Sequence, residues 1–230
     1  MTAIFAVIFI PAIVFGQQTE QQQRVTALKQ AVQQSIAGQH KYEWIETTTV
    51  SLKGEVKSQK QNRCYYAADG KIQKVPIGDA TPAPQEQSGG RRGRIKNRVV
   101  AKKKGEMTDY MKKAVDLVRQ YVPPDPALIK YSKDVKKVAV EPFEPNRVVR
   151  VSFHDFKKTG DLLSATFNIQ SNTILDINVS TWLESQKDGI TLEVGFTQLP
   201  DGTSYANKTT LDAKSKDIKV VVENSGHRML

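Results

Sequence analysis

The fold of this chain is decided by residues 162–196, which read LLSATFNIQSNTILDINVSTWLESQKDGITLEVGF. Apolar and polar residues alternate here in three runs, separated by Ser171-Asn172 and by Lys187-Asp188-Gly189. Successive side chains of a β-strand point to opposite faces, so the alternation predicts strands with one apolar and one polar face. The short turns predict that neighbouring runs pair as an antiparallel meander.

The same pattern continues on both sides of this stretch. A further alternating run spans residues 218–222, and turn signals stand at residues 158–161 and 200–202. Residues 42–75 are rich in β-branched and aromatic types and are divided by Gly54 and by Asp69-Gly70, which is a hairpin signal. The chain therefore predicts one antiparallel sheet to which both halves contribute.

Helical periodicity appears in two places. Apolar residues recur at steps of three and four from Val25 to Ile36 and again from Met107 to Val122, where Pro123 ends the pattern. A short helix is also expected over residues 127–133. The expected fold class is α+β, a curved antiparallel sheet covered by two amphipathic helices, since these helices are the candidates to cover its apolar face.

Composition excludes several classes of protein. The 230 residues include 34 Lys and Arg against 24 Asp and Glu, which gives a net charge of +10. A single cysteine rules out an intramolecular disulfide framework, and its spacing from the three histidines matches no zinc motif. We therefore expect no metal and no cofactor.

The N-terminus predicts export. Residues 3–15 are apolar except for Pro11 and are followed by a glutamine-rich tract, which is typical of a signal peptide and too short to span a bilayer. The expected domains are a signal peptide over residues 1–16, cleaved near Gly16, and a single domain over residues 17–230 in the periplasm or outside the cell. A buried N-terminal core strand or helix is the alternative.

A cationic run follows a segment rich in Pro and Gly, and together they predict a flexible excursion over residues 76–104. The run consists of Arg91, Arg92, Arg94, Lys96, Arg98, Lys102, Lys103 and Lys104. It is either a solvated helix face or a patch for anionic surfaces such as phospholipid head groups. Nucleic acid is not expected, because the run contains no stacking aromatic residue.

Catalytic signatures are missing from the sequence. It contains no nucleophile elbow, phosphate loop or dinucleotide fingerprint. His154 and Asp155 are adjacent and would point to opposite faces of a strand, and Cys64 lies in a predicted strand where packing is the expected role. We expect no enzyme, with an exported hydrolase whose site is assembled across the fold as the third hypothesis.

The order of the elements resembles the periplasmic outer-membrane lipoprotein carrier and sorting superfamily. The likeness covers a helix over residues 20–38, strands from Tyr42, an inserted helix that ends at Pro123, and a C-terminal meander containing residues 199–205 and 220–224. Members of that superfamily are soluble proteins whose incomplete barrel is lined by apolar side chains and capped by helices. The resemblance thus implies a half-barrel that binds lipid or the acyl chains of a lipidated protein, without catalysis and as a monomer.

The residues expected to line that cavity are the apolar members of the alternating runs and of the inserted helix. They are Leu163, Phe167, Leu175, Ile177, Val179, Leu192, Val194, Phe196, Val118 and Tyr121. The alternative is that they form a dry core under the helices. The second functional hypothesis is an envelope protein-interaction module that docks on anionic partners or membrane surfaces through its cationic helix.

Overall fold

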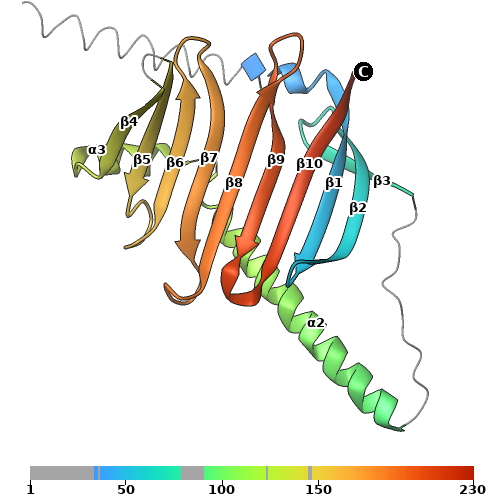
Figure 1. Cartoon of the computed structure of the whole chain (residues 1–230). Coiled ribbons are helices and arrows are strands. Elements are labelled where there is room, and N and C mark those ends of the chain that lie inside the picture. Colours follow the sequence, from blue (N-terminus) through green and yellow to red (C-terminus); the bar gives the residue numbers. More distant parts are fainter. Residues whose placement is uncertain (1–33, 36, 79–90, 123, 145–146) are drawn as a thin grey trace, which may run out of the picture.

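The computed structural model describes residues 34–35, 37–78, 91–122, 124–144 and 147–230, and for residues 91–101, 103, 104 and 126 it describes the backbone only. Ten strands form one antiparallel sheet that is not closed (Figure 1). In chain order, the strands are β1 (Tyr42–Leu52), β2 (Glu55–Tyr66), β3 (Ile72–Ile77), β4 (Val138–Glu144), β5 (Val148–His154), β6 (Leu162–Asn168), β7 (Thr173–Trp182), β8 (Gly189–Gln198), β9 (Ser204–Ala213) and β10 (Ile218–Met229). The helices are α2 (Arg91–Val118), α3 (Pro126–Asp134) and the short 3-10 helix η1 (Lys214–Lys216).

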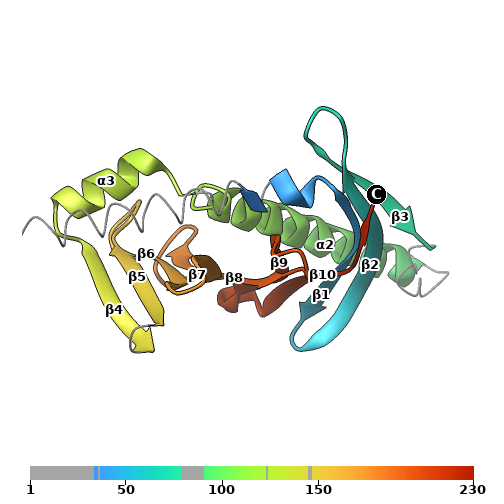
Figure 2. The ribbon, with the colours of Figure 1, turned by 90° about the horizontal axis from the view of Figure 1, so that it is seen from above.

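The spatial order of the strands is β3-β2-β1-β10-β9-β8-β7-β6-β5-β4. Strands β4 to β10 therefore form a meander that includes the predicted runs, and β10 then pairs with β1. This pairing leaves β3 and β4 at opposite edges, so the chain crosses the whole sheet between them through α2 and α3. Seen from above, the sheet is curved and both helices lie on the same side of it (Figure 2).

The predicted turns fall between the strands where the sequence placed them. Lys53 and Gly54 turn between β1 and β2 with positive φ angles of 53° and 79°, and Gly70 turns between β2 and β3 with φ 75°. The short helix expected over residues 127–133 is α3, which begins after Asp125. The Asp125 side chain accepts a hydrogen bond from the Ala127 backbone N–H, which caps the helix. Strands β4 and β9 were not predicted.

The two ends of the sheet differ in what covers them. Strands β1 and β10 pair Leu52 with Ile218 at one end, the Leu52 end, and Tyr42 with Met229 at the other, the Tyr42 end. The turns over residues 155–161, 183–188 and 214–217 all lie at the Leu52 end. Ala114 and Val118 of α2 pack there in a cluster with Ile190 and Ile218, so the core sits between α2 and the sheet.

Three sequence predictions concern segments that are described in part. The segment expected as an excursion over residues 76–104 has regular secondary structure at both ends. Pro76 and Ile77 belong to β3, and residues 91–104 belong to α2. Residues 79–90 lie outside the described residues. The expected signal peptide over residues 1–16 and most of the helix expected over residues 20–38 also lie outside the described residues. Of that helix, residues 34–35 and 37–38 are described and are helical, and residue 39, beyond the predicted end, is helical too.

Candidate functional site

The residues predicted to line an acyl cavity lie mostly in a packed core. Those that belong to the core cluster are Val118, Tyr121, Leu163, Ile177, Val179, Leu192 and Val194, each at most 7% exposed. Phe196 is half-buried and packs against this cluster, whereas Phe167 and Leu175 are half-buried outside it. The face beneath α2 is therefore filled by the side chains of α2 and the sheet.

Leu175 departs from the predicted face because β7 contains a bulge. Thr166 pairs with Asp176 and Phe167 with Ile174, so Leu175 is an extra residue on β7. An extra residue inverts the alternation beyond it. As a result Ile174, rather than Leu175, packs against the core cluster.

Tyr121, in the turn that follows α2, fastens the C-terminal end of α2 to the Leu52 end of the sheet. Its side chain is fully buried, and its hydroxyl donates to Asp161 Oδ2 at 2.5 Å and lies 2.9 Å from Thr181 Oγ1. Burial and, secondarily, the Asp161 carboxylate raise the pKa of Tyr121 far above its ordinary value. The hydroxyl therefore stays protonated and can donate continuously.

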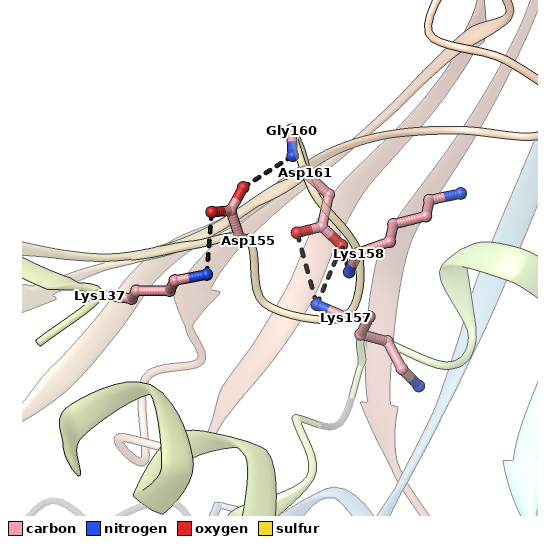
Figure 3. Close-up of polar contacts among 6 residues, drawn as sticks. All are labelled: Lys137, Asp155, Lys157, Lys158, Gly160 and Asp161. Carbon is pink, nitrogen blue, oxygen red and sulfur yellow. Dashed lines mark hydrogen bonds and ion pairs between the residues drawn. The ribbon is translucent and has the colours of Figure 1, made fainter. Parts of the chain in front are cut away.

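The turn between β5 and β6 holds Asp161 ready for this contact (Figure 3). The buried Asp161 carboxylate also accepts hydrogen bonds from the backbone N–H groups of Lys157 and Lys158, at 3.1 and 3.0 Å. Asp155 accepts from the Gly160 N–H at 2.7 Å and pairs with Lys137 at 3.0 Å, and these contacts lower the pKa of Asp155. Every acidic group of the turn is thus engaged, which indicates a structural role.

A second tyrosine fastens the middle of α2. The half-buried Tyr110 donates to Asp188 Oδ1 at 2.6 Å and lies 3.2 Å from Ser215 Oγ. Asp188 belongs to the turn between β7 and β8, and Ser215 belongs to η1. Helix α2 and the turn that follows it are thus tied by polar contacts to three turns at the Leu52 end.

The Tyr42 end of the sheet contains a different feature, an aromatic pocket of about 170 Å³. Its walls come from β1, β2, β3, β9 and β10, from the turn between β8 and β9, and from the helical residue Gln39. The lining residues are Gln39, Tyr42, Trp44, Glu46, Tyr66, Ile72, Leu199, Tyr205, Ala206, Asn224 and His227. Ala206 also packs against the core cluster, so the pocket adjoins the core.

Aromatic rings form most of the pocket wall. The His227 ring stacks on the Trp44 indole at 5.9 Å between centroids and lies 3.9 Å from the ring of Tyr205. Trp44 also contacts Tyr66, and the Tyr66 ring is stacked on His40 at 4.2 Å between centroids. The pocket therefore offers flat, apolar surfaces.

A β-bulge puts His227 into this wall. Glu43 pairs with Arg228 and Ile45 with Ser225, so Gly226 and His227 lie together opposite Trp44. Gly226 has φ 61°, a conformation that glycine adopts without strain. Without the bulge, alternation from Val220 and Val222 would continue through Asn224 and turn His227 to the other face.

Two polar atoms that belong to residues lining the pocket are buried and unpaired within the described part of the chain. They are Trp44 Nε1, a donor, and Asn224 Oδ1, an acceptor, whereas Asn224 Nδ2 donates to the Ala206 carbonyl at 2.8 Å. The charged group of the pocket is compensated, because both oxygens of Glu46 accept from Lys74 Nζ at 2.6 Å. Burial lowers the pKa of His227, which favours its neutral form.

A second, shallow hollow of about 190 Å³ lies on the opposite, polar face of the sheet. Ser164, Asn178 and Glu193 are among its lining residues, and Val179 and Leu192 border it as well. Asn178 donates to Asp176, which accepts from Thr166, so these polar groups are satisfied by one another. This hollow has no unpaired buried polar atom among the described residues.

The cationic run forms the N-terminal half of α2. In Figure 1 this half extends beyond the ends of the strands. Of its side chains the structure describes Lys102, which is exposed and lies 4.0 Å from Glu106. No described helix is both long and apolar enough to cross a membrane.

The cysteine and the histidine considered for catalysis lie in different environments, one buried and one exposed. Cys64 is completely buried, and burial raises the pKa of its thiol, so its expected packing role agrees with its position. His154 is exposed at the end of β5. Nowhere in the described ranges do three His, Cys, Asp or Glu side chains gather as a metal site requires.

Sequence reasoning missed the residues of the aromatic pocket. The signal that could have indicated them is the alternation of Tyr42, Trp44 and Glu46, which puts two large rings and a carboxylate on one strand face. None of the ten residues predicted to line a cavity contributes to this pocket.

No family model and no curated protein matches this chain. Two solved structures do. A DUF1329 family protein from Desulfovibrio piger is 8% identical, with a TM-score of 0.36, over 89% of this chain and 92% of that chain. An outer membrane lipoprotein-sorting protein domain from Vibrio parahaemolyticus is 10% identical, with a TM-score of 0.33, over 90% of this chain and 93% of that chain. The resemblance drawn from the order of elements is thus found again among solved structures, at a level that carries no argument about function.

Proposed function

We propose that this chain is an exported, non-catalytic protein that binds lipid, or the acyl chain of a lipidated protein, on the apolar face of its sheet. One observation carries the proposal. Helix α2 packs on that face at the Leu52 end, while the Tyr42 end holds an apolar-walled pocket that adjoins the core at Ala206. Beyond the pocket lie the apolar side chains that α2 and the sheet pack together, and an acyl chain that enters at the pocket reaches them when α2 moves away.

The size of the pocket sets a condition on this mechanism. About 170 Å³ accommodates a ring-sized molecule, since a cavity of about 150 Å³ binds benzene. A longer chain needs α2 to move away from the sheet. Each methylene that leaves water then contributes about 0.8 kcal/mol, which offsets the contacts that α2 gives up.

The polar contacts of α2 fit such a movement. Tyr110 and Tyr121 hold the helix through hydrogen bonds to turns, and these bonds can be exchanged for water without rebuilding the sheet. The predicted lining residues that belong to the core cluster, together with Phe196, then supply the surface that the acyl chain contacts.

Native mass spectrometry of the purified protein tests the proposal, because a bound lipid adds its mass to the folded chain. Affinity can be measured with a fluorescent fatty acid such as cis-parinaric acid. Phe196→Gln removes an apolar contact next to Ala206 and is expected to weaken binding about tenfold or more.

Thr197→Gln is the matched control, because Thr197 is exposed and is the next residue of β8. It should leave the affinity unchanged. A purified protein that carries no lipid and binds no fatty acid would refute the proposal. Equal affinity of both variants would refute the placement of the chain beside Phe196.

The second candidate function is docking on an anionic membrane or partner through the cationic half of α2. The observation that favours it is the extension of this half beyond the ends of the strands (Figure 1). Each basic residue near an anionic surface adds about 1 kcal/mol, and salt screens this attraction. Salt-sensitive binding to anionic vesicles therefore distinguishes docking from acyl binding.

A further inference from the structure

The sheet ends in two open edges, at β3 and at β4 (Figure 1). Among the described strands, β3 pairs only with β2, and β4 pairs only with β5. All six residues of β3 are exposed, and on β4 the side chains of Val140 and Phe143 are 64% and 63% exposed. An open edge that carries apolar side chains is a template on which a further strand can add.

Proline occurs in these two edge strands and in none of the other eight described strands. The two residues are Pro76 in β3 and Pro142 in β4. Proline has no backbone N–H, so it removes a hydrogen bond on the side toward which its nitrogen points. The direction of each nitrogen therefore decides whether the proline affects the sheet or its open edge.

The nitrogen of Pro76 points away from β2. The Ala67 N–H donates to the Lys71 carbonyl at 2.9 Å, so these two residues form a hydrogen-bonded pair next to the turn between β2 and β3. Hydrogen-bonded and non-hydrogen-bonded pairs alternate along an antiparallel ladder. Counted from that pair through the register, Asn62 and Pro76 form a non-hydrogen-bonded pair. The backbone of Pro76 therefore faces the open edge.

The nitrogen of Pro142 points away from β5 by the same count. The His154 N–H donates to the Lys137 carbonyl at 2.9 Å, which makes this pair hydrogen-bonded. Alternation from there makes Pro142 and Val149 a non-hydrogen-bonded pair, and the bulge of β4 comes only after Pro142. Both prolines thus face outward, at opposite edges of one sheet.

We propose that Pro76 and Pro142 close the two edges against a second copy of this chain, whose β4 would otherwise pair with β3 and extend the sheet. A strand that approaches either edge meets a proline in place of a hydrogen-bond donor. Charge favours the pairing of unlike edges, because the charged residue of β3 is Lys74 and those of β4 are Glu141 and Glu144. This inference goes beyond the proposed function and does not depend on it.

Restoring the missing donors tests the proposal by sedimentation velocity. Pro76→Thr and Pro142→Thr each open one edge and should stay monomeric when alone, because β3 of one copy and β4 of the next then still include one proline. A mixture of the two variants should form a 1:1 dimer, and the double variant should form longer oligomers. Pro200→Thr is the matched control, because Pro200 is exposed in the turn between β8 and β9, and it should sediment as the native chain does.

A dimer of fixed size that forms only on mixing distinguishes edge pairing from aggregation of a less stable chain. If the mixture and the double variant both remain monomeric, the inference is overturned. A single variant that dimerises alone also overturns it, because that dimer joins two like edges.

The direction of the backbone groups can be tested separately in β4. The N–H of Val140 points outward as the nitrogen of Pro142 does, whereas Glu141 forms a hydrogen-bonded pair with Arg150. Glu141→Pro should lower the melting temperature by about 6 °C or more, and Val140→Pro should leave it nearly unchanged. Equal losses would show that the prolines do not face outward and would overturn the inference.

Discussion

Tyr121→Phe removes one hydroxyl from the core and leaves the ring in place. The hydroxyl donates to Asp161 and contacts Thr181, and all three residues are buried. The substitution therefore isolates the polar contact that holds the C-terminal end of α2 on the sheet.

The expected cost follows from what remains around Asp161. Hydrogen bonds to a charged group contribute about 1.5–3 kcal/mol. Asp161 keeps two backbone donors, from Lys157 and Lys158, so its charge is still partly compensated after the substitution. We therefore expect a loss of about 2 kcal/mol in the free energy of unfolding, or about 4–8 °C in melting temperature.

Urea unfolding followed by circular dichroism measures this loss, and Tyr110→Phe is the matched control. Tyr110 also donates to a carboxylate from α2, but it is half-buried and its partner Ser215 is exposed. Water can replace that contact, so the expected cost is about 1 kcal/mol or less.

The reasoning also predicts a consequence for binding. A helix that is held less firmly should admit a fatty acid faster, so Tyr121→Phe should raise the rate of uptake more than Tyr110→Phe does. If the two variants lose equal stability, or if Tyr110→Phe loses more, burial does not set the strength of these contacts and the argument fails.

Three further predictions concern other parts of the chain. Burial lowers the pKa of His227 below its unfolded value of about 6.5, so its contribution to stability is full above that pH and is lost as pH falls through the folded pKa. Between pH 7.5 and pH 5, the melting temperature should therefore fall more steeply for the native chain than for His227→Phe. Parallel slopes would contradict this. Cys64 should react with Ellman's reagent only after unfolding, because its thiol is buried and its pKa is raised; rapid labelling of the folded protein would show that β2 opens. Replacing Lys102, Lys103 and Lys104 by Gln should reduce sedimentation with anionic vesicles and spare fatty-acid binding. Loss of fatty-acid binding with unchanged sedimentation would contradict this, because it would place these lysines in acyl binding and not in docking.

The strands and turns could be predicted because their signals are local. Alternation in residues 162–196 showed which side chains share one face of the sheet. Gly54, Gly70 and Gly202 marked turns of the chain that require a positive φ angle. The same reasoning predicted the position of α3, but it put the end of the inserted helix at Val122, whereas α2 ends at Val118.

The candidate site could not be predicted because it depends on bulges and on a long-range pairing. Leu175 was assigned to the apolar face by simple alternation, but one extra residue on β7 transfers that role to Ile174. His227 reaches Trp44 only through the bulge at Gly226, and only because β10 pairs with β1 from the other end of the chain.

The sequence by itself determined a net-basic chain with one cysteine, an antiparallel meander, an inserted amphipathic helix and an apolar face to cover. The tertiary structure alone decided that α2 fills the face beneath it and that the cavity lies at the Tyr42 end, among residues of β1, β2 and β10. The physical reason is that periodicity states which side chains share a face, whereas packing across distant strands decides whether that face is filled or hollow.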